Sequence, residues 1–169
     1  MNRYTTAVVA VARGINRGTI FACGLLMATL TMIVLLQVLY RYVLELPLIW
    51  SDEAARHLLV WLSVIGGGVA IAQGLHPRIE VIDSLRSAAA RRAVEVVVSI
   101  LVLAFLFYFV VISLDVALIY NRYRSLALGL PQSVPRLALP IGGCLMAINT
   151  LALLLEKIGT PLESGTTRK

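Results

Sequence analysis

Four long apolar runs, separated by short polar or basic segments, dominate the pattern of the sequence. They cover approximately residues 18–40, 54–73, 93–119 and 137–155. About 20 consecutive apolar residues are enough for an α-helix to cross the ~30 Å hydrocarbon core of a bilayer. We therefore predict an all-α integral membrane protein in which residues 1–169 form a single domain of four transmembrane helices.

The second apolar run opens with a signal for the start of a helix. Ser51 can act as an N-cap, and Asp52 and Glu53 place negative charge at the positive end of the helix dipole. Arg56 and His57 follow at helical spacing, so these charges share one helix face and can pair there. The pattern predicts that the second helix begins at Ser51 with a polar clasp at the membrane surface.

The segments between the runs are short. Residues 1–17 are predicted to be a basic tail. The apolar run that follows them has no signal-peptide cleavage pattern, so it is predicted to be an anchor helix rather than a signal peptide. Within residues 79–92, apolar positions recur every three or four residues among arginines, which predicts a short amphipathic helix on the membrane surface. Residues 126–140 contain three prolines and predict a folded interfacial loop.

Basic residues indicate the orientation of the helices. With four spans both termini lie on one side, and that side carries ten lysines and arginines: three before the first span, four in the second connection and three after the last span. The other side carries five, two in the first connection and three in the third. By the positive-inside rule, we predict that both termini are cytoplasmic.

Composition supports a membrane protein and argues against nucleic acid as a partner. The chain is 59% hydrophobic and 14% charged, with a mean hydropathy of +0.88. The net charge of +6 is divided among the segments between apolar runs instead of forming one basic patch. Such a distribution is typical of topology control and of contact with phospholipids.

Reactive side chains are few and widely separated. The predicted spans place Cys23 and Cys144 at depths that differ by roughly 12 Å, beyond the ~7 Å Cα separation that a disulfide allows. His57 and His76 lie at opposite ends of the second span and cannot ligate one haem together. Because no catalytic motif is present either, we expect no enzyme activity, no metal site and no cofactor in this chain.

The polar residues inside the spans do not suggest an ion pathway. Glu95 and Asp115 fall near opposite edges of the third span, so no carboxylate lies at the midplane where a small proton-coupled exporter would need one. Asn149 is the most deeply placed strong hydrogen-bonding side chain, with Gln37 nearer an edge. For Asn149 we favour an interhelical hydrogen bond over ligand binding.

Small residues point to helix packing. Gly66, Gly67 and Gly68 are consecutive, and at 100° per residue they remove side chains from about 200° of arc, more than one neighbouring helix can cover. Small residues also recur at intervals of four, which permits close approach of helices. These further pairs and triplets are Gly14–Gly18–Ala22, Gly66–Ala70, Ala138–Gly142 and Gly143–Ala147.

Several short motifs occur in a specific order over residues 20–155. They are an arginine–aromatic pair, W-S-D-E-x-x-R, a second span with an aromatic residue and glycines, G-x-H at its end, and a later L-G-L-P before an L-P pair. They fall on Arg41 and Tyr42; Trp50, Glu53 and Arg56; Trp61 with Gly66 and Gly67; Gly74 and His76; Leu128–Pro131; and Leu139 and Pro140. In this respect the chain resembles the small membrane subunit, DctQ-like, of tripartite ATP-independent periplasmic (TRAP) transporters.

The resemblance implies a division of labour. A periplasmic substrate-binding protein would capture an organic acid or similar solute, and a large DctM-like subunit in the bacterial inner membrane would carry it with the sodium gradient. The chain itself would be the scaffold, holding the fixed part of the large subunit with its first span and residues 79–92. The candidate subunit-interface and structural residues are Arg41, Trp50, Glu53, Arg56, Trp61, Gly66, Gly67, Gly74, His76 and Asn149.

One hypothesis concerns the ends of the second span. Arg41, Glu53 and Arg56 would form a charged cluster that fixes its periplasmic entry, and His76 would do the same at the cytoplasmic edge. The alternative for each residue is that its side chain simply extends to the interface. Two alternative functions also stay open: a stand-alone small transporter, and a cofactor-free membrane assembly or regulatory protein.

Overall fold

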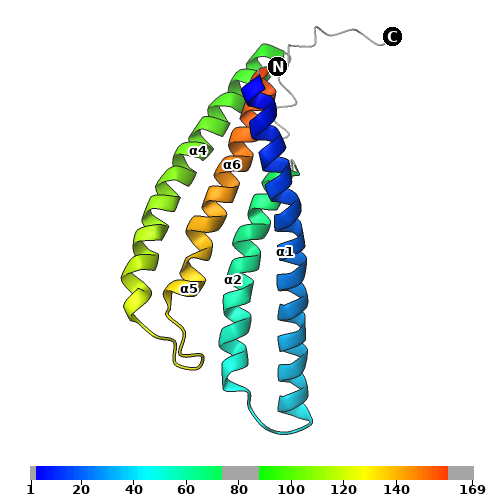
Figure 1. Ribbon diagram of the computed structural model, residues 1–169, viewed down its shortest axis with the longest axis vertical. Coiled ribbons are helices and arrows are strands. Elements are labelled where there is room, and N and C mark those ends of the chain that lie inside the picture. The colour runs from blue at the N-terminus through cyan, green and yellow to red at the C-terminus, as the bar shows by residue number, and fades with distance from the viewer. Residues whose placement is uncertain (1–2, 74–87, 160–169) are drawn as a thin grey trace, which may run out of the picture.

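The chain folds as a bundle of long helices (Figure 1). The computed structural model describes residues 3–73 and 88–159, and the side chains of residues 11–73 and 90–155. The helices are α1 (Arg3–Tyr42), α2 (Ile49–Ala72), α4 (Ala88–Ile119), the 3-10 helix η1 (Tyr120–Arg122), α5 (Ser133–Arg136) and α6 (Ala138–Gly159). Within the described ranges the only strand-like pairing is one isolated bridge, Arg124 with Pro131.

Four helical segments in the described part of the chain are long and apolar enough to cross a membrane, as the sequence predicts. They are Val11–Tyr42, Ile49–Ala72, Ala90–Arg122 and Ser133–Leu155. The beginning of α1 and the end of α6 lie at the same end of the bundle (Figure 1). The chain is therefore a multi-pass membrane protein.

The α6 helix occupies the centre. It packs against α1, α2 and α4, whereas α1 and α4 do not contact each other within the described residues. In the most apolar stretch of each helix, 44% of residues are buried in α6, compared with 6% in α1 and 11% in α4. The bundle therefore leaves most of α1 and α4 exposed at its surface.

Glycines bring the α2 and α6 backbones together. A Cβ atom added at Gly142 of α6 would lie 3.0 Å from the carbonyl oxygen of Val64 in α2. One added at Gly68 of α2 would lie 3.3 Å from Cβ of Leu145. Both helices thus carry glycine where the other approaches closely, as small-residue packing in membranes requires.

A third glycine serves the contact between α6 and α4. A Cβ atom at Gly143 would lie 2.8 Å from Cγ2 of Val110 and 3.2 Å from Cδ1 of Phe109. Gly142 and Gly143 are adjacent, so their faces differ by about 100° around α6. This pair lets α6 fit between α2 and α4.

Three predicted boundaries are wrong. Residues 3–17 of the predicted tail, 1–17, belong to α1, which is already helical at Arg3. Helix propagation costs little after nucleation, and no proline interrupts residues 3–42. Likewise Ala88–Arg92 belong to α4 rather than to a separate surface helix, since three alanines lead directly into the third apolar run. The rest of the predicted amphipathic segment, residues 79–87, lies outside the described residues.

The third correction concerns the start of α2. The helix begins at Ile49, and the N-cap position is Leu48, whose side chain forms no capping hydrogen bond. Ser51 lies inside the first turn, where its hydroxyl donates to the Leu48 carbonyl oxygen at 2.7 Å. The serine is fully buried and satisfies its own polar group instead of capping the helix.

The connection between α4 and α6 forms an ordered hairpin-like loop. The Ser125 amide donates to the Leu130 carbonyl at 2.8 Å, and the Gln132 amide donates to the Tyr123 carbonyl at 2.8 Å. Gly129 occupies the left-handed region with φ 64°, a conformation that glycine adopts without steric cost. The predicted folded loop is thus confirmed over residues 123–132, while residues 138–140 already belong to α6.

Candidate functional site

A polar junction joins three helices in the bundle. The Asn149 side chain of α6 donates to the carbonyl oxygen of Gly68 in α2 at 2.8 Å. It also exchanges two hydrogen bonds with Asn16 of α1, at 2.8 and 3.0 Å. Asn149 is only 3% exposed. The interhelical hydrogen bond expected for Asn149 is therefore present, and it connects α1, α2 and α6 at one level.

Asn16 is the member of this junction that the sequence did not reveal. Its segment is predicted to be a basic tail, which would not place a partner beside Asn149. The signal that could have identified it is the helical continuity of residues 3–42, which lack proline. Once that segment is helical, Asn16 is a polar residue two positions beyond Gly14 in a lipid-facing helix.

At the other end of the bundle, Glu53 joins α2 to the loop that precedes α5. The backbone N–H of Ala127 donates to Glu53 Oε2 at 3.1 Å, across 74 residues of sequence. Glu53 Oε1 lies 3.8 Å from His57 Nε2, one helical turn further along. A carboxylate that accepts a backbone N–H forms one of the stronger hydrogen bonds in proteins. Glu53 therefore fastens the loop to α2.

The structure does not bring Arg41, Glu53 and Arg56 together as the hypothesis required. No ion pair joins these three residues, all of which are among those that the structure describes, and Arg56 is exposed. The reason is helical geometry, because successive residues point about 100° apart. Asp52 faces α1, so Glu53 turns toward the loop and away from Arg41.

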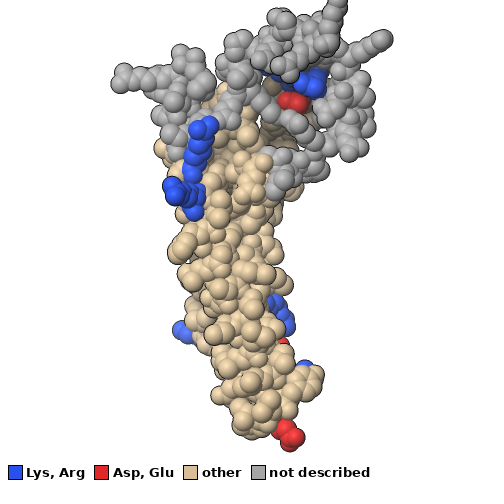
Figure 2. All heavy atoms as spheres, turned by 90° about the vertical axis from the view of Figure 1, so that its right-hand side faces the viewer, with Lys and Arg blue, Asp and Glu red and all other residues tan. Residues whose placement is uncertain are grey.

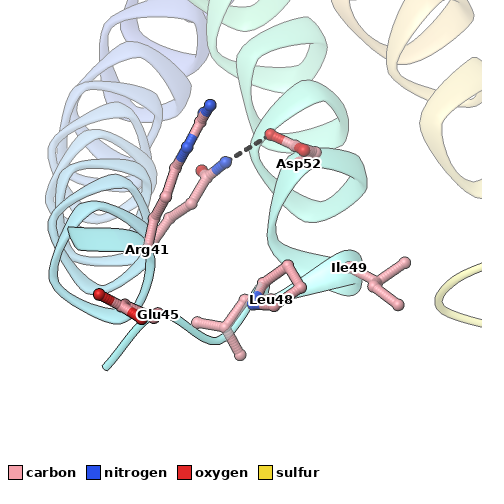
Figure 3. A pocket seen from close by; sticks show the side chains of 7 residues that line it. Arg41, Glu45, Leu48, Ile49 and Asp52 are labelled. Carbon is pink, nitrogen blue, oxygen red and sulfur yellow. Dashed lines mark hydrogen bonds between the residues drawn. The ribbon is translucent and has the colours of Figure 1, made fainter. Parts of the chain in front are cut away.

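Instead, Arg41 belongs to a pocket at the junction of α1 and α2 (Figure 3). Gln37 of α1 donates through Nε2 to Asp52 Oδ1 of α2. The pocket has a volume of about 510 Å³ and is open to the outside. Its lining residues are Gln37, Arg41, Glu45, Pro47, Leu48, Ile49 and Asp52.

The remaining candidate residues occupy different environments. Trp50 is 38% exposed at the start of α2, and Trp61 is half-buried further along the helix. Gly67 faces the Met146 side chain of α6, whereas Gly66 has no neighbour within 4 Å. The triple glycine thus has two members against α6 and one facing out of the bundle. Gly74 and His76 lie outside the described residues.

Three glycines of α1 also face out of the bundle. An added Cβ atom at Gly14, Gly18 or Gly24 would meet no atom of the described residues within 4 Å. The small-residue spacing Gly14–Gly18 is therefore not used by any helix of this chain in the described part. A glycine inside a helix costs about 1 kcal/mol relative to alanine, and here no contact within the bundle offsets that cost.

Candidate reactive groups are separated in the structure. Cys23 and Cys144 are both free thiols. In the described ranges, no group of three or more histidine, cysteine, aspartate or glutamate side chains could hold a metal ion. On the face shown in Figure 2, charged side chains lie toward the two ends with an uncharged band between them. The described features are those of a packed membrane bundle with polar groups at its ends.

Comparison with known proteins gives a family match. Residues 30–160 match the family model for tripartite ATP-independent periplasmic transporters, DctQ component. The ectoine TRAP transporter small permease protein TeaB of Halomonas elongata is 30% identical over 142 residues, covering 82% of this chain and 72% of TeaB. The sialic acid TRAP transporter small permease protein SiaQ of Vibrio cholerae is 28% identical over 126 residues, covering 75% and 73%.

A longer relative matches through one segment. The isethionate TRAP transporter permease protein DctMQ of Oleidesulfovibrio alaskensis is 28% identical over 133 residues. The match covers 74% of this chain but only 21% of that protein. The sequence of this chain thus has a counterpart inside a much larger permease.

Proposed function

Because the chain belongs to the DctQ component family of tripartite ATP-independent periplasmic transporters, we propose that it is the small, non-catalytic scaffold subunit of such a transporter. Its partner is a large DctM-like subunit that carries solute with the sodium gradient. A periplasmic substrate-binding protein delivers the solute. The complex lies in the bacterial inner membrane, with both termini of this chain in the cytoplasm.

The observation that carries the scaffold role is the set of glycines that have no neighbour among the described residues of other helices. Gly14 and Gly18 are one turn apart on α1, and Gly66 lies in the middle of α2. Small residues on a membrane helix allow another helix to approach closely, whereas lipid chains gain nothing from them. These glycines therefore favour a helix of another protein beside α1 and α2.

The long permease relative supports the same partner. In DctMQ of Oleidesulfovibrio alaskensis, a segment similar to this chain is part of one longer polypeptide. Two segments joined in one chain are held at a high effective concentration, as in a complex. We take this arrangement as support for a large membrane subunit beside the present chain.

The proposed solute is an organic acid or a similar small polar molecule. The relatives are named for ectoine, sialic acid and isethionate, so small permeases of one family accompany different solutes. A scaffold that does not touch the solute would be compatible with this variety. We assign the choice of solute to the large subunit and the binding protein.

Copurification and uptake test this proposal together. Affinity purification of the tagged full chain should recover a large membrane subunit in stoichiometric amount. In proteoliposomes, solute uptake under a sodium gradient should require the large subunit, the binding protein and this chain. Full-rate uptake without this chain would remove the scaffold role. Solute accumulation by this chain alone would instead identify a stand-alone transporter.

A further inference from the structure

The pocket between α1 and α2 has the chemistry of a zwitterion site. We propose that it binds the headgroup of a phospholipid with a primary ammonium group, phosphatidylethanolamine, with the phosphate on Arg41 and the ammonium on Asp52. The proposal rests on the pocket itself and does not depend on the transporter assignment.

The pocket lies at the depth where lipid headgroups lie. It is formed at the last turn of α1 and the first turn of α2, and both helices are long and apolar enough to span a membrane. Tyr40, Tyr42 and Trp50 flank it in sequence, and such aromatic residues are typical of the membrane–water interface. A lipid molecule beside these helices would therefore place its headgroup at the level of the pocket.

The cation of the pocket is available for a phosphate group. Arg41 is exposed, and its guanidinium lies 5.8 Å from the centre of the Tyr42 ring. It forms no ion pair with a carboxylate among the residues that the structure describes. Arginine recognises phosphate oxygens through several parallel N–H donors. Figure 3 shows Arg41 extending from α1 toward the level of Asp52.

The two carboxylates of the pocket favour an ammonium group. Asp52 accepts a hydrogen bond from Gln37 through Oδ1, and it is exposed. Glu45 lines the same pocket from the connecting turn, where its φ of 53° places it in the left-handed region. With one arginine, one aspartate and one glutamate, the pocket carries a formal charge of −1. A ligand with a phosphate alone would meet more negative than positive charge.

This charge pattern distinguishes three common headgroups. A primary ammonium donates three hydrogen bonds to carboxylates, whereas the quaternary ammonium of phosphatidylcholine donates none. Phosphatidylglycerol has no cation to place beside Asp52. Pro47, Leu48 and Ile49 supply an apolar wall for the glycerol and the first acyl carbons. We expect the order phosphatidylethanolamine, phosphatidylcholine, phosphatidylglycerol.

Native mass spectrometry of the full chain tests this order. The detergent-solubilised protein is mixed with equimolar amounts of the three lipids, with matched acyl chains, and the bound lipids are counted. Wild type should retain phosphatidylethanolamine preferentially. Arg41→Gln should lower the retention of all three lipids by about threefold, because each of them carries the phosphate, and Asp52→Asn should reduce the preference for phosphatidylethanolamine by about threefold, the size expected for exposed charge pairs. Asparagine can still accept the hydrogen bond from Gln37, so helix content should be unchanged.

Matched controls separate the pocket from general lipid contact. Arg122→Gln and Asp115→Asn remove an exposed charge of the same sign elsewhere on the bundle and should leave both the lipid retention and the lipid preference unchanged. Glu45→Gln gives a second carboxylate variant that does not touch the Gln37–Asp52 pair, in case Asp52→Asn alters the fold. The proposal is overturned if wild type shows no preference, or if pocket and control variants behave alike.

Two further measurements distinguish a bound lipid from a free anion or a protein segment in the pocket. Soluble phosphoethanolamine in excess should displace only part of the bound lipid, because it lacks the acyl chains. Inorganic phosphate that displaced the lipid as well as phosphoethanolamine would reassign the pocket to free anions and overturn the proposal. Loss of the preference in the purified complex with the large subunit would show that a protein segment fills the pocket, and would overturn it too.

Discussion

At the scale of single residues, Asn149 has the largest expected effect on stability. Asn149→Leu removes three hydrogen bonds and leaves the Gly68 carbonyl and the Asn16 amide inside the bundle without their partner. Interhelical hydrogen bonds in membranes contribute about 0.6 kcal/mol each on average, up to ~1.7. We therefore expect a loss of about 1–3 kcal/mol in the free energy of unfolding, measured by titration with a denaturing detergent.

Asn16→Leu is the matched variant for this prediction. It removes the two hydrogen bonds to Asn149 but retains the one from Asn149 to Gly68. Its loss of stability should be smaller than that of Asn149→Leu. If Asn16→Leu were the more damaging change, or if both variants were as stable as wild type, the junction would not contribute as the geometry indicates.

Also at the residue scale, Glu53 is expected to control the order of the loop between α4 and α5. Glu53→Ala removes the acceptor of the Ala127 N–H, so amide exchange at Ala127 should become several-fold faster while the loop's own hairpin hydrogen bonds persist. Glu53→Gln keeps a neutral acceptor and should show a smaller effect. Hydrogen–deuterium exchange of residues 123–130 measures both.

Arg56→Ala serves as the control for Glu53, since Arg56 is exposed and forms no polar contact in the described part of the chain. Faster exchange in Arg56→Ala would instead support the charged cluster of Arg41, Glu53 and Arg56 that the sequence suggested.

For the charged residues at the start of α2, the sequence predicts their place in the helix but not their partners. Spacing places Asp52, Glu53, Arg56 and His57 near one end of a helix, but the 100° step between Asp52 and Glu53 sends them to different partners.

At the scale of elements, the glycines of α2 and α6 differ in what surrounds them. Gly142→Ala should destabilise the bundle by about 1–3 kcal/mol, the usual cost of overpacking, because the new Cβ would lie 3.0 Å from the Val64 carbonyl oxygen. Gly66→Ala adds the same methyl group where nothing lies within 4 Å. It should be neutral or stabilise α2 by up to about 1 kcal/mol. Thermal unfolding in one detergent compares the two.

Equal effects of the two substitutions would contradict the observed packing of α2 against α6. The sequence predicted that one helix could not cover all three consecutive glycines, and the structure agrees, with Gly67 and Gly68 against α6 and Gly66 outside. The sequence alone did not predict which glycine faces which helix. Helix ends were also poorly predicted, since the ends of α1, α2 and α4 depend on propagation of helices past residues whose polarity suggested a stop.

At the scale of the whole molecule, the number of membrane spans and the family can be predicted from the sequence. Which helix packs against which cannot. The four apolar runs have similar composition, so nothing in them indicates that α6 is central and that α1 and α4 are outer. That order depends on specific pairs such as Gly142 with Val64 and Gly143 with Val110. Pairs between distant segments cannot be assigned from the periodicity of one chain.

The outer position of α1 leads to the last prediction. If a helix of the large subunit packs on Gly14 and Gly18, then the double substitution Gly14→Leu and Gly18→Leu should reduce recovery of that subunit in affinity purification by about tenfold. That corresponds to a loss of about 1.4 kcal/mol. The fold should be retained, because an added Cβ atom at either position meets no described atom within 4 Å. Ala28→Leu, at an exposed position later in α1, should leave recovery unchanged. Equal recovery with the double variant and the control would place the partner on another face, and the exposed surface of α4 would be the next to test.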